Sequence, residues 1–336
     1  MNHMITQNEI SVEQNWLFEL KNSISSPKAL LEILQIDENQ INDDFSAKKL
    51  FPMRVPLSFV NRMNKQDPKD PLLMQVLPVM KEFEVNKNFT KDPLKEQKNQ
   101  ITGLLHKYKN RVLIMFKTGC AINCRYCFRR HFPYQENSLN KNKINVILEY
   151  IKQNSSINEV ILSGGDPLMA KDHEIKSFLE KLSYIKTITT LRIHTRLPVV
   201  IPSRITDSLV KILCDSPLKI VIVTHINHPN EINDEFSKHI SKLKNITILN
   251  QSVFLKGINN DSSILKNLSD KLFHAGILPY YIHATDAVEG TSHFFVPDSE
   301  TKKIMRELLT LTSGYLVPKL VRENAGELSK TPIDLF

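Results

Sequence analysis

Residues 111–132 read RVLIMFKTGCAINCRYCFRRHF, an apolar run that leads directly into three closely spaced cysteines. The run RVLIMF has the length and the residue types of a buried strand. Cys120, Cys124 and Cys127 follow it in the spacing CxxxCxxC. Three thiolates close in sequence can hold three irons of a [4Fe–4S] cluster, and the missing fourth cysteine leaves one iron open for a substrate-derived ligand. The stretch therefore predicts an iron–sulfur site on a loop that follows a strand.

A structural zinc site is the second interpretation of the same cysteines. His131 follows Cys127 after three intervening residues, so CxxxCxxCxxxH could supply four tetrahedral ligands. Structural zinc usually organises a small module, whereas this loop follows a strand in a large domain, and that context favours the cluster. The remaining cysteine, Cys214, is remote in sequence, so the four cysteines do not resemble a disulfide framework. Free thiolate ligands favour a reducing, cytoplasmic compartment.

The chain after the cysteines alternates between short apolar runs and amphipathic runs. The further strand-like runs are EVILS, TLRIH, KIVIVTH, ITILNQSVF and PYYIHA, and helical patterns such as EIKSFLEKL and ILKNLSDKLF lie between them. Six strands, each followed by a crossover, predict an α/β fold with a parallel sheet, either open or curled towards a barrel. The site is expected in the loops that follow the strands.

The chain divides into three predicted parts. Residues 1–108 form an N-terminal helical region, with helical spacing in NWLFELKNSI and ALLEILQI and interruptions at several prolines. Residues 109–300 form the partial barrel, and residues 301–336 form a C-terminal extension. We find no repeat or long linker, so a separately mobile domain is not expected.

The net charge is +8, but basic residues are spread along the chain rather than gathered in one run. We therefore expect no nucleic-acid partner, although a zinc-containing nucleic-acid-binding protein would use the same charge. No apolar run has membrane-spanning length, and the first residues, MNHMITQNEI, lack the layout of a signal peptide. We expect a cytoplasmic protein with no membrane partner.

The cysteine loop GCAINCRYCFRRHFPYQ resembles that of the radical S-adenosylmethionine (radical SAM) aminomutases related to lysine 2,3-aminomutase. The likeness continues through LSGGDPLM, LRIHTRLPVVIPSRIT, VTHINHPNE, LNQSVFLKGIN, PYYIHATDAVEGTSHFFVP and VRENAGELSKTPIDL. Upstream, RVPLSFVNRM and DPKDPLLMQVLP are similar to the shorter branch of this family, the elongation factor P β-lysylation proteins, and the lack of a cysteine after Cys214 agrees with that branch. The resemblance implies an incomplete (β/α)6 radical-SAM barrel with a [4Fe–4S] cluster, S-adenosyl-L-methionine and pyridoxal 5'-phosphate.

Five residues match family positions around S-adenosylmethionine. They are Gly164, Gly165 and Asp166 of GGDP, His225 and Gln251. A glycine pair lets backbone approach a ligand closely, and an adjacent aspartate could orient an ammonium or ribose group. The alternatives are an ordinary strand-to-helix turn for GGDP and satisfied polar residues at a barrel rim for the other two.

Lys330 lies in GELSKTP, which resembles the segment that presents the Schiff-base lysine of the family. A covalent bond between this lysine and pyridoxal phosphate would give the migrating nitrogen a π-system to move through. Arg111 matches the arginine that binds the cofactor phosphate, for which a guanidinium fork is well shaped. The alternatives are a disordered tail lysine and a strand-end arginine.

A lysine substrate needs one cation for its carboxylate and one anion for its ε-ammonium group. Arg129 matches the carboxylate-binding arginine of the family, and Asp286 matches an ammonium-binding aspartate. A second family aspartate falls where this chain has Glu323, which keeps the charge but changes its reach.

The resemblance implies an isomerase that converts L-lysine to β-lysine, with an electron donor and a functional link to a ligase that acts on elongation factor P. A radical-SAM aminomutase for another amino acid, such as glutamate or arginine, is the alternative that keeps the cluster and Lys330.

Overall fold

The computed structural model describes residues 12–41, 44–97 and 100–336; residues 1–11, part of the predicted helical region, lie outside this description. The strands are β1 (Leu104–Tyr108), β2 (Arg111–Lys117), β3 (Glu159–Gly164), β4 (Thr190–Thr195), β5 (Lys219–His225), β6 (Thr247–Val253), β7 (Leu278–His283), β8 (Lys319–Arg322) and β9 (Thr331–Pro332). The α-helices are α1 (Val12–Lys21), α2 (Pro27–Leu34), α3 (Glu38–Ile41), α4 (Leu57–Val60), α5 (Lys141–Gln153), α6 (Asp172–Ser183), α7 (Leu197–Val200), α8 (Asp207–Cys214), α9 (Asp234–Ile240), α10 (Ser262–His274) and α11 (Asp298–Leu311).

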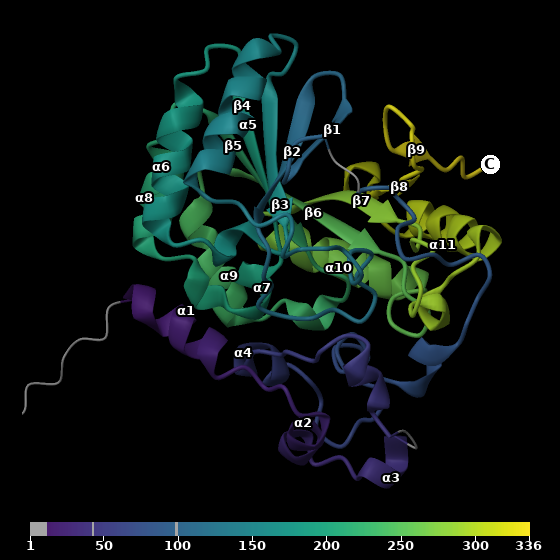
Figure 1. Cartoon of the computed structure of the whole chain (residues 1–336). Helices are drawn as coiled ribbons and strands as arrows, with labels where there is room; N and C mark the ends of the chain where they lie inside the picture. The colour runs from purple at the N-terminus through teal and green to yellow at the C-terminus, as the bar shows by residue number, and fades with distance from the viewer. Residues whose placement is uncertain (1–11, 42–43, 98–99) are drawn as a thin grey trace, which may run out of the picture.

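The described strands form one sheet in which neighbours follow sequence order from β1 to β9. β2 to β8 run parallel, whereas β1 pairs antiparallel with β2 and β9 pairs antiparallel with β8. β1 and β9 are the two ends of this order, so the sheet curls without closing (Figure 1). The incomplete parallel barrel is therefore confirmed.

The predicted strands are β2 to β7, and the two quoted helical patterns are α6 and α10. β8 extends the parallel set by one strand. β1, β8 and β9 were not predicted because they are short or carry several polar residues, as in LLHKY and KLVR. Such segments lack the apolar pattern by which strands are recognised in a sequence.

The N-terminal region lies below the barrel in Figure 1 and shares its core. Trp16 of α1, Leu30 of α2 and Phe59 of α4 are completely buried in the same apolar cluster as Val199 of α7. The α-helices of this region end at Val60, and the chain from there to β1 forms mainly turns, where prolines remove backbone donors. The helical part is therefore shorter than predicted.

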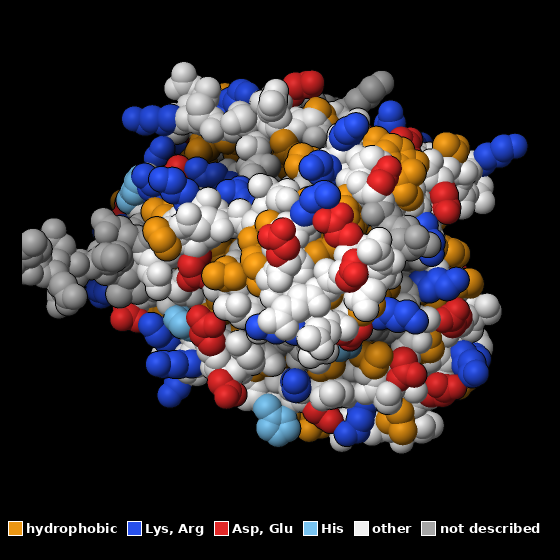
Figure 2. All heavy atoms as spheres, turned by 90° about the horizontal axis from the view of Figure 1, so that it is seen from below, with side chains coloured by type: hydrophobic (Ala, Val, Ile, Leu, Met, Phe, Trp, Pro, Cys, Tyr) orange, Lys and Arg blue, Asp and Glu red, His pale blue; other side chains and the backbone are white. Residues whose placement is uncertain are grey.

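The surface carries interspersed charges. Figure 2 shows basic and acidic side chains mixed over the face seen from below, with no large area of one sign. No helix in the described ranges has both the length and the hydropathy needed to cross a bilayer.

Candidate active site

A cavity of about 540 Å³ lies inside the partial barrel. Alternate residues of the strands point into it, such as Arg192 and His194 of β4 and Tyr281 and His283 of β7. This spacing follows from the two-residue period of a strand. All the residues assigned from the sequence line the same cavity: Cys120, Cys124, Cys127, Arg111, Arg129, Gly164, Gly165, Asp166, His225, Gln251, Asp286 and Lys330.

The three cysteines are half-buried in the loop between β2 and α5. Burial, together with the neighbouring cysteines, raises the pKa of Cys127 to about 11 and the pKa of Cys120 well above its ordinary value. Buried thiols that raise one another's pKa lie close together, and the positive charge of Arg129 only partly offsets this rise. A metal cluster would supply further positive charge, because bound metal favours the thiolate form.

The arrangement suits a cluster rather than a single metal ion. Among the described residues, no three His, Cys, Asp or Glu side chains converge on a point where they could bind one ion. His131 is half-buried and its Nε2 lies 3.1 Å from the carbonyl oxygen of Glu289, so the Cys₃His zinc interpretation has no support in the geometry. In a cubane each cysteine binds a different iron, so the sulfurs need not converge.

The glycine pair after β3 packs against the cysteine loop itself. A Cβ on Gly164 would lie 2.3 Å from the carbonyl oxygen of Lys117, and one on Gly165 would lie 2.4 Å from that of Gly119. Gly164 also has a φ of +115°, which other residues rarely adopt. The pair therefore lets two backbone segments meet beneath the cysteines.

Asp166 is buried and fully engaged by protein donors. Its oxygens accept hydrogen bonds from Leu168 N at 3.0 Å, Thr195 Oγ1 at 2.7 Å, Arg196 N at 2.7 Å and Leu197 N at 2.8 Å. Burial raises the pKa of this carboxyl group, although these bonds favour the charged form. Asp166 thus joins the ends of β3 and β4, and any effect on a ligand passes through that backbone.

His225, the last residue of β5, and Gln251 of β6 are register partners. His225 Nε2 lies 3.0 Å from the hydroxyl of Tyr126, and the two rings stack with centroids 5.6 Å apart. Burial and the charge of Arg196 lower the pKa of His225 well below its ordinary value, so the ring is neutral.

The N-terminal region holds the arginines beside the cysteines. Glu82 is completely buried and accepts hydrogen bonds from Arg125 Nε at 2.8 Å and Arg130 Nη2 at 2.6 Å. Glu96 accepts one from Arg129 Nε at 2.7 Å. Each of these guanidinium groups is therefore fixed by an acid from outside the barrel.

Lys330 enters the cavity between β8 and β9. Its Nζ lies 2.5 Å from Oε2 of Glu323, whose other oxygen lies 3.3 Å from both Lys107 Nζ and Tyr108 Oη. Burial opposes ionisation of Glu323, but Lys330 and Lys107 lower its pKa to about 2. Glu323 is therefore ionised and paired with two lysines.

Opposite charges also line the cavity wall. Lys107 Nζ lies 2.8 Å from Glu96 Oε1, so Lys107 joins the Glu323 pair to the Glu96–Arg129 pair. Burial and the negative charge of Glu323 raise the pKa of Asp286 to about 7. Asp286 is thus an acid that a cationic ligand would ionise.

Arg111 stands at the amino end of β2. Its guanidinium carbon lies 3.9 Å from the centroid of the Tyr108 ring, and its Nη1 donates to Asn110 Oδ1 at 3.2 Å. This places a positive charge at the cavity wall near Tyr108.

Several cavity residues were not identified from the sequence. His194 lies on β4, Arg196 directly follows β4, and His283 lies on β7. Lys107 lies on β1, and Glu96 precedes that strand. Burial lowers the pKa of His283 to about 3, and His194 Nε2 has no hydrogen-bond partner among the described residues. The signal for the histidines was available, because polar residues at alternate positions of an apolar strand indicate an inner polar face.

Comparison with known proteins identifies close relatives. Residues 114–260 match the model of the Radical SAM superfamily. The chain is 53% identical over 338 residues to L-lysine 2,3-aminomutase of Escherichia coli (strain K12), covering 100% of this chain and 98% of that one. It is 54% identical to the L-lysine 2,3-aminomutases of Haemophilus influenzae and Buchnera aphidicola subsp. Baizongia pistaciae, over 325 and 327 residues, with 96% of each chain covered.

Proposed function

Because this chain belongs to the lysine 2,3-aminomutase family of radical SAM isomerases, we propose that it converts L-lysine to β-lysine by moving the amino group from C2 to C3. One observation carries the proposal within the structure. A single cavity joins the three-cysteine loop to a lysine, Lys330, that the fold holds inside the barrel. A radical source and a covalent anchor for a carbonyl cofactor can therefore act on the same bound molecule.

Cys120, Cys124 and Cys127 would hold the [4Fe–4S] cluster, since they are three half-buried cysteines on one loop. When bound, the cluster together with S-adenosylmethionine would supply the radical chemistry that removes hydrogen from a substrate carbon. The chain's own part is to exclude water and to hold His225 and Gln251 beside the cluster loop. The Gly164–Gly165 backbone packs closely against that loop and fixes its position.

Lys330 would hold pyridoxal phosphate, and Arg111 would bind its phosphate group. When bound, the cofactor would supply an electron-accepting π-system next to the migrating nitrogen. Glu323 supports this assignment because its Oε2 lies 2.5 Å from Lys330 Nζ and keeps that side chain oriented into the cavity. Glu323 also pairs with Lys107 at 3.3 Å, so it would keep a cationic partner if Lys330 lost its charge on binding the cofactor.

Arg129 and Asp286 would bind the two ends of lysine. Arg129 is held through Nε by Glu96 and donates through Nη1 to Ser163 Oγ at 3.1 Å, so its guanidinium group is fixed before substrate arrives. Asp286, with a pKa near 7, becomes fully ionised when an ammonium group binds. The carboxylate of Asp286 also disfavours L-glutamate as a substrate, because it would repel the second carboxylate of glutamate.

The product would be used by a ligase that acts on elongation factor P. Similarity to that branch of the family supports this step, and a cytoplasmic location with a one-electron donor suits the reduced cluster. Deleting the gene for this chain should remove the β-lysyl mass from elongation factor P in the same cells, and unchanged modification would reject the link.

The direct test uses anaerobically reconstituted protein with S-adenosylmethionine, pyridoxal phosphate, a reductant and one amino acid at a time. L-lysine should yield β-lysine, whereas L-glutamate and L-arginine should not react. Conversion of either of those in preference to lysine would keep the radical chemistry and replace the substrate.

A further inference from the structure

A buried polar network surrounds Arg196, which directly follows β4. Arg196 Nη1 donates a hydrogen bond to Cys124 Sγ at 2.9 Å. Its Nη2 donates to Gln75 Oε1 at 2.8 Å and to Glu231 Oε2 at 3.0 Å. Within the described ranges, Arg196 is the one charged side chain that donates a hydrogen bond to a cysteine sulfur. Cys124 therefore differs from Cys120 and Cys127 in having a cationic donor on its sulfur.

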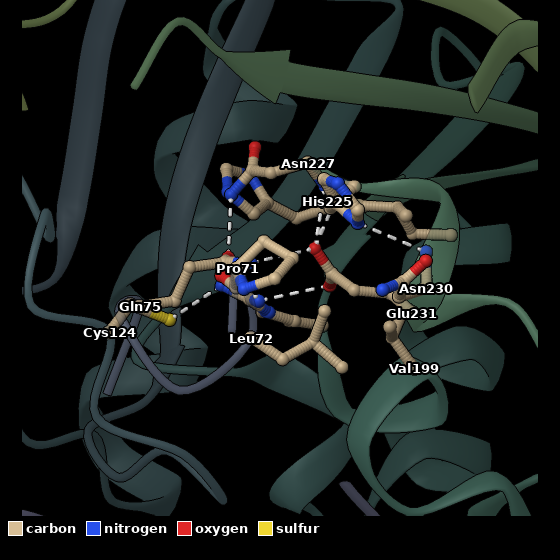
Figure 3. A network of polar contacts seen from close by, with 12 residues as sticks. Pro71, Leu72, Gln75, Cys124, Val199, His225, Asn227, Asn230 and Glu231 are labelled. Carbon is tan, nitrogen blue, oxygen red and sulfur yellow. Dashed lines mark hydrogen bonds and ion pairs between the residues drawn. The ribbon is translucent and has the colours of Figure 1, made fainter. Parts of the chain in front are cut away.

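Glu231 is fixed in turn by the segment that follows β5. It is completely buried, and its Oε1 accepts hydrogen bonds from Asn227 N at 2.9 Å, His228 N at 3.1 Å and Gln75 Nε2 at 3.2 Å. Figure 3 shows Cys124 beside Gln75, with Asn227 and Glu231 in the same network of polar contacts. The guanidinium group is therefore held in one position from its far side.

The network also fixes an aromatic side chain. Tyr126 Oη lies against Arg196 Nη1 and accepts a hydrogen bond from Asn227 Nδ2 at 2.7 Å. Tyr126 belongs to the cysteine loop, so Arg196 contacts this loop through both Cys124 and Tyr126.

Hydrogen bonds and charge next to a cysteine ligand set the reduction potential of an iron–sulfur cluster, because they stabilise the additional electron. Arg196 brings one positive charge to Cys124, and Glu231 offsets part of that charge from behind. We propose that Arg196 is a positioning residue that raises the reduction potential of the cluster through Cys124, and that Glu231 limits this rise. The inference requires the cluster but is independent of lysine as the substrate.

Redox titration of the reconstituted protein, followed by electron paramagnetic resonance without S-adenosylmethionine or lysine, tests this proposal. Arg196→Gln should lower the ratio of reduced to oxidised cluster at a fixed potential about tenfold, which is a shift of about 59 mV for one electron. Arg196→Lys keeps the charge and should recover part of the shift. Glu231→Gln should change the ratio in the opposite direction, because the charge of Arg196 is then uncompensated.

Asp172→Asn is the matched control. Asp172 is also a buried acid, and it accepts hydrogen bonds from Arg204 at 2.8 Å and Thr206 at 3.0 Å, neither of which belongs to the cysteine loop, so its loss should leave the potential unchanged. Iron and sulfide contents show which variants retain the cluster. Equal potentials in all variants, or shifts of the same sign for Arg196→Gln and Glu231→Gln, would overturn the proposal. If Arg196→Gln fails to hold a cluster, the other two variants decide the question. Arg196→Lys should then lower the reduction potential slightly, and Glu231→Gln should raise it.

Discussion

The cluster end of the cavity and the Lys330 end are held by different means. At the cluster end, three buried acids, Asp166, Glu82 and Glu231, each accept several hydrogen bonds from backbone or arginine. At the other end, Lys330 lies between a four-residue strand and a two-residue strand and forms one ion pair with Glu323. The cluster end is thus fixed by many hydrogen bonds and ion pairs, whereas the Lys330 end is fixed by a short hairpin and a few ion pairs.

The difference follows from what each end would do in the proposed reaction. A cluster has to keep its geometry through every turnover, so its loop is enclosed by strands and by the N-terminal region. A lysine that exchanges covalent partners has to move, so it belongs on a segment with few fixed contacts. Substitutions at the two ends should therefore separate radical formation from nitrogen migration.

The largest effect is expected at the cluster end. Replacing any one of Cys120, Cys124 and Cys127 by Ala should abolish cleavage of S-adenosylmethionine, because each thiolate would hold its own iron. Anaerobic wild-type protein should contain about four irons and four sulfides per chain. Cys214→Ala is the control, since Cys214 is exposed on α8, and it should retain both. Stoichiometric zinc without sulfide would contradict the cluster.

Lys330→Ala should abolish β-lysine formation while leaving slow cleavage of S-adenosylmethionine, because the cluster end does not depend on the tail. Borohydride treatment followed by peptide mapping should place the pyridoxal label on the segment containing GELSKTP in the wild-type protein. The exposed Lys319 of β8 provides a control: Lys319→Ala should keep the label and the activity. A label on a different lysine would transfer the role to that residue.

Asp286→Asn should weaken lysine turnover while the cluster and the label on Lys330 remain. Leaving a buried ammonium group without its partner costs about 2–5 kcal/mol, so kcat/KM for lysine should fall roughly 30- to 5,000-fold. The cluster spectrum and cofactor content of the variant serve as the controls. Normal turnover would show that another group selects the substrate.

The smallest effect concerns stability and pH. The pKa of Asp286 is raised from 3.8 to about 7, so the folded protein binds this proton more tightly than the unfolded chain and loses stability as pH rises through that interval. Asp286→Asn removes the loss, and at about 1.4 kcal/mol per pKa unit it should raise the free energy of unfolding by roughly 4 kcal/mol at pH 8. The gain should fall to about two-fifths of that value at pH 5. Urea denaturation without lysine at both pH values measures it, and a gain independent of pH would contradict the raised pKa.

The barrel and the cluster end of the cavity were predictable from the sequence because their signals are local. Apolar runs of strand length gave β2 to β7, and the cysteine spacing marked the cluster loop. Lys330 was found through resemblance, since nothing in one lysine distinguishes it from the others.

The residues that hold the site were not predictable from local patterns. Gln75 lies in a turn, Glu82 in a short 3-10 helix and Glu96 in irregular chain, so no periodicity marks them, and their roles arise when the N-terminal region packs on the barrel. Gly165 was interpreted as allowing a ligand to approach, but its close neighbour is the backbone of Gly119, and that pairing requires the tertiary structure.

The short strand β9 has a consequence for association between molecules. A sheet that does not close leaves two edges whose backbone groups can pair with another chain and start aggregation. At one edge, β9 has only Thr331 and Pro332, and proline has no N–H to offer. At the other edge, a register shift between Leu105 and Tyr108 interrupts β1. The hairpin that brings Lys330 into the cavity thus also protects the open barrel against growth by strand addition.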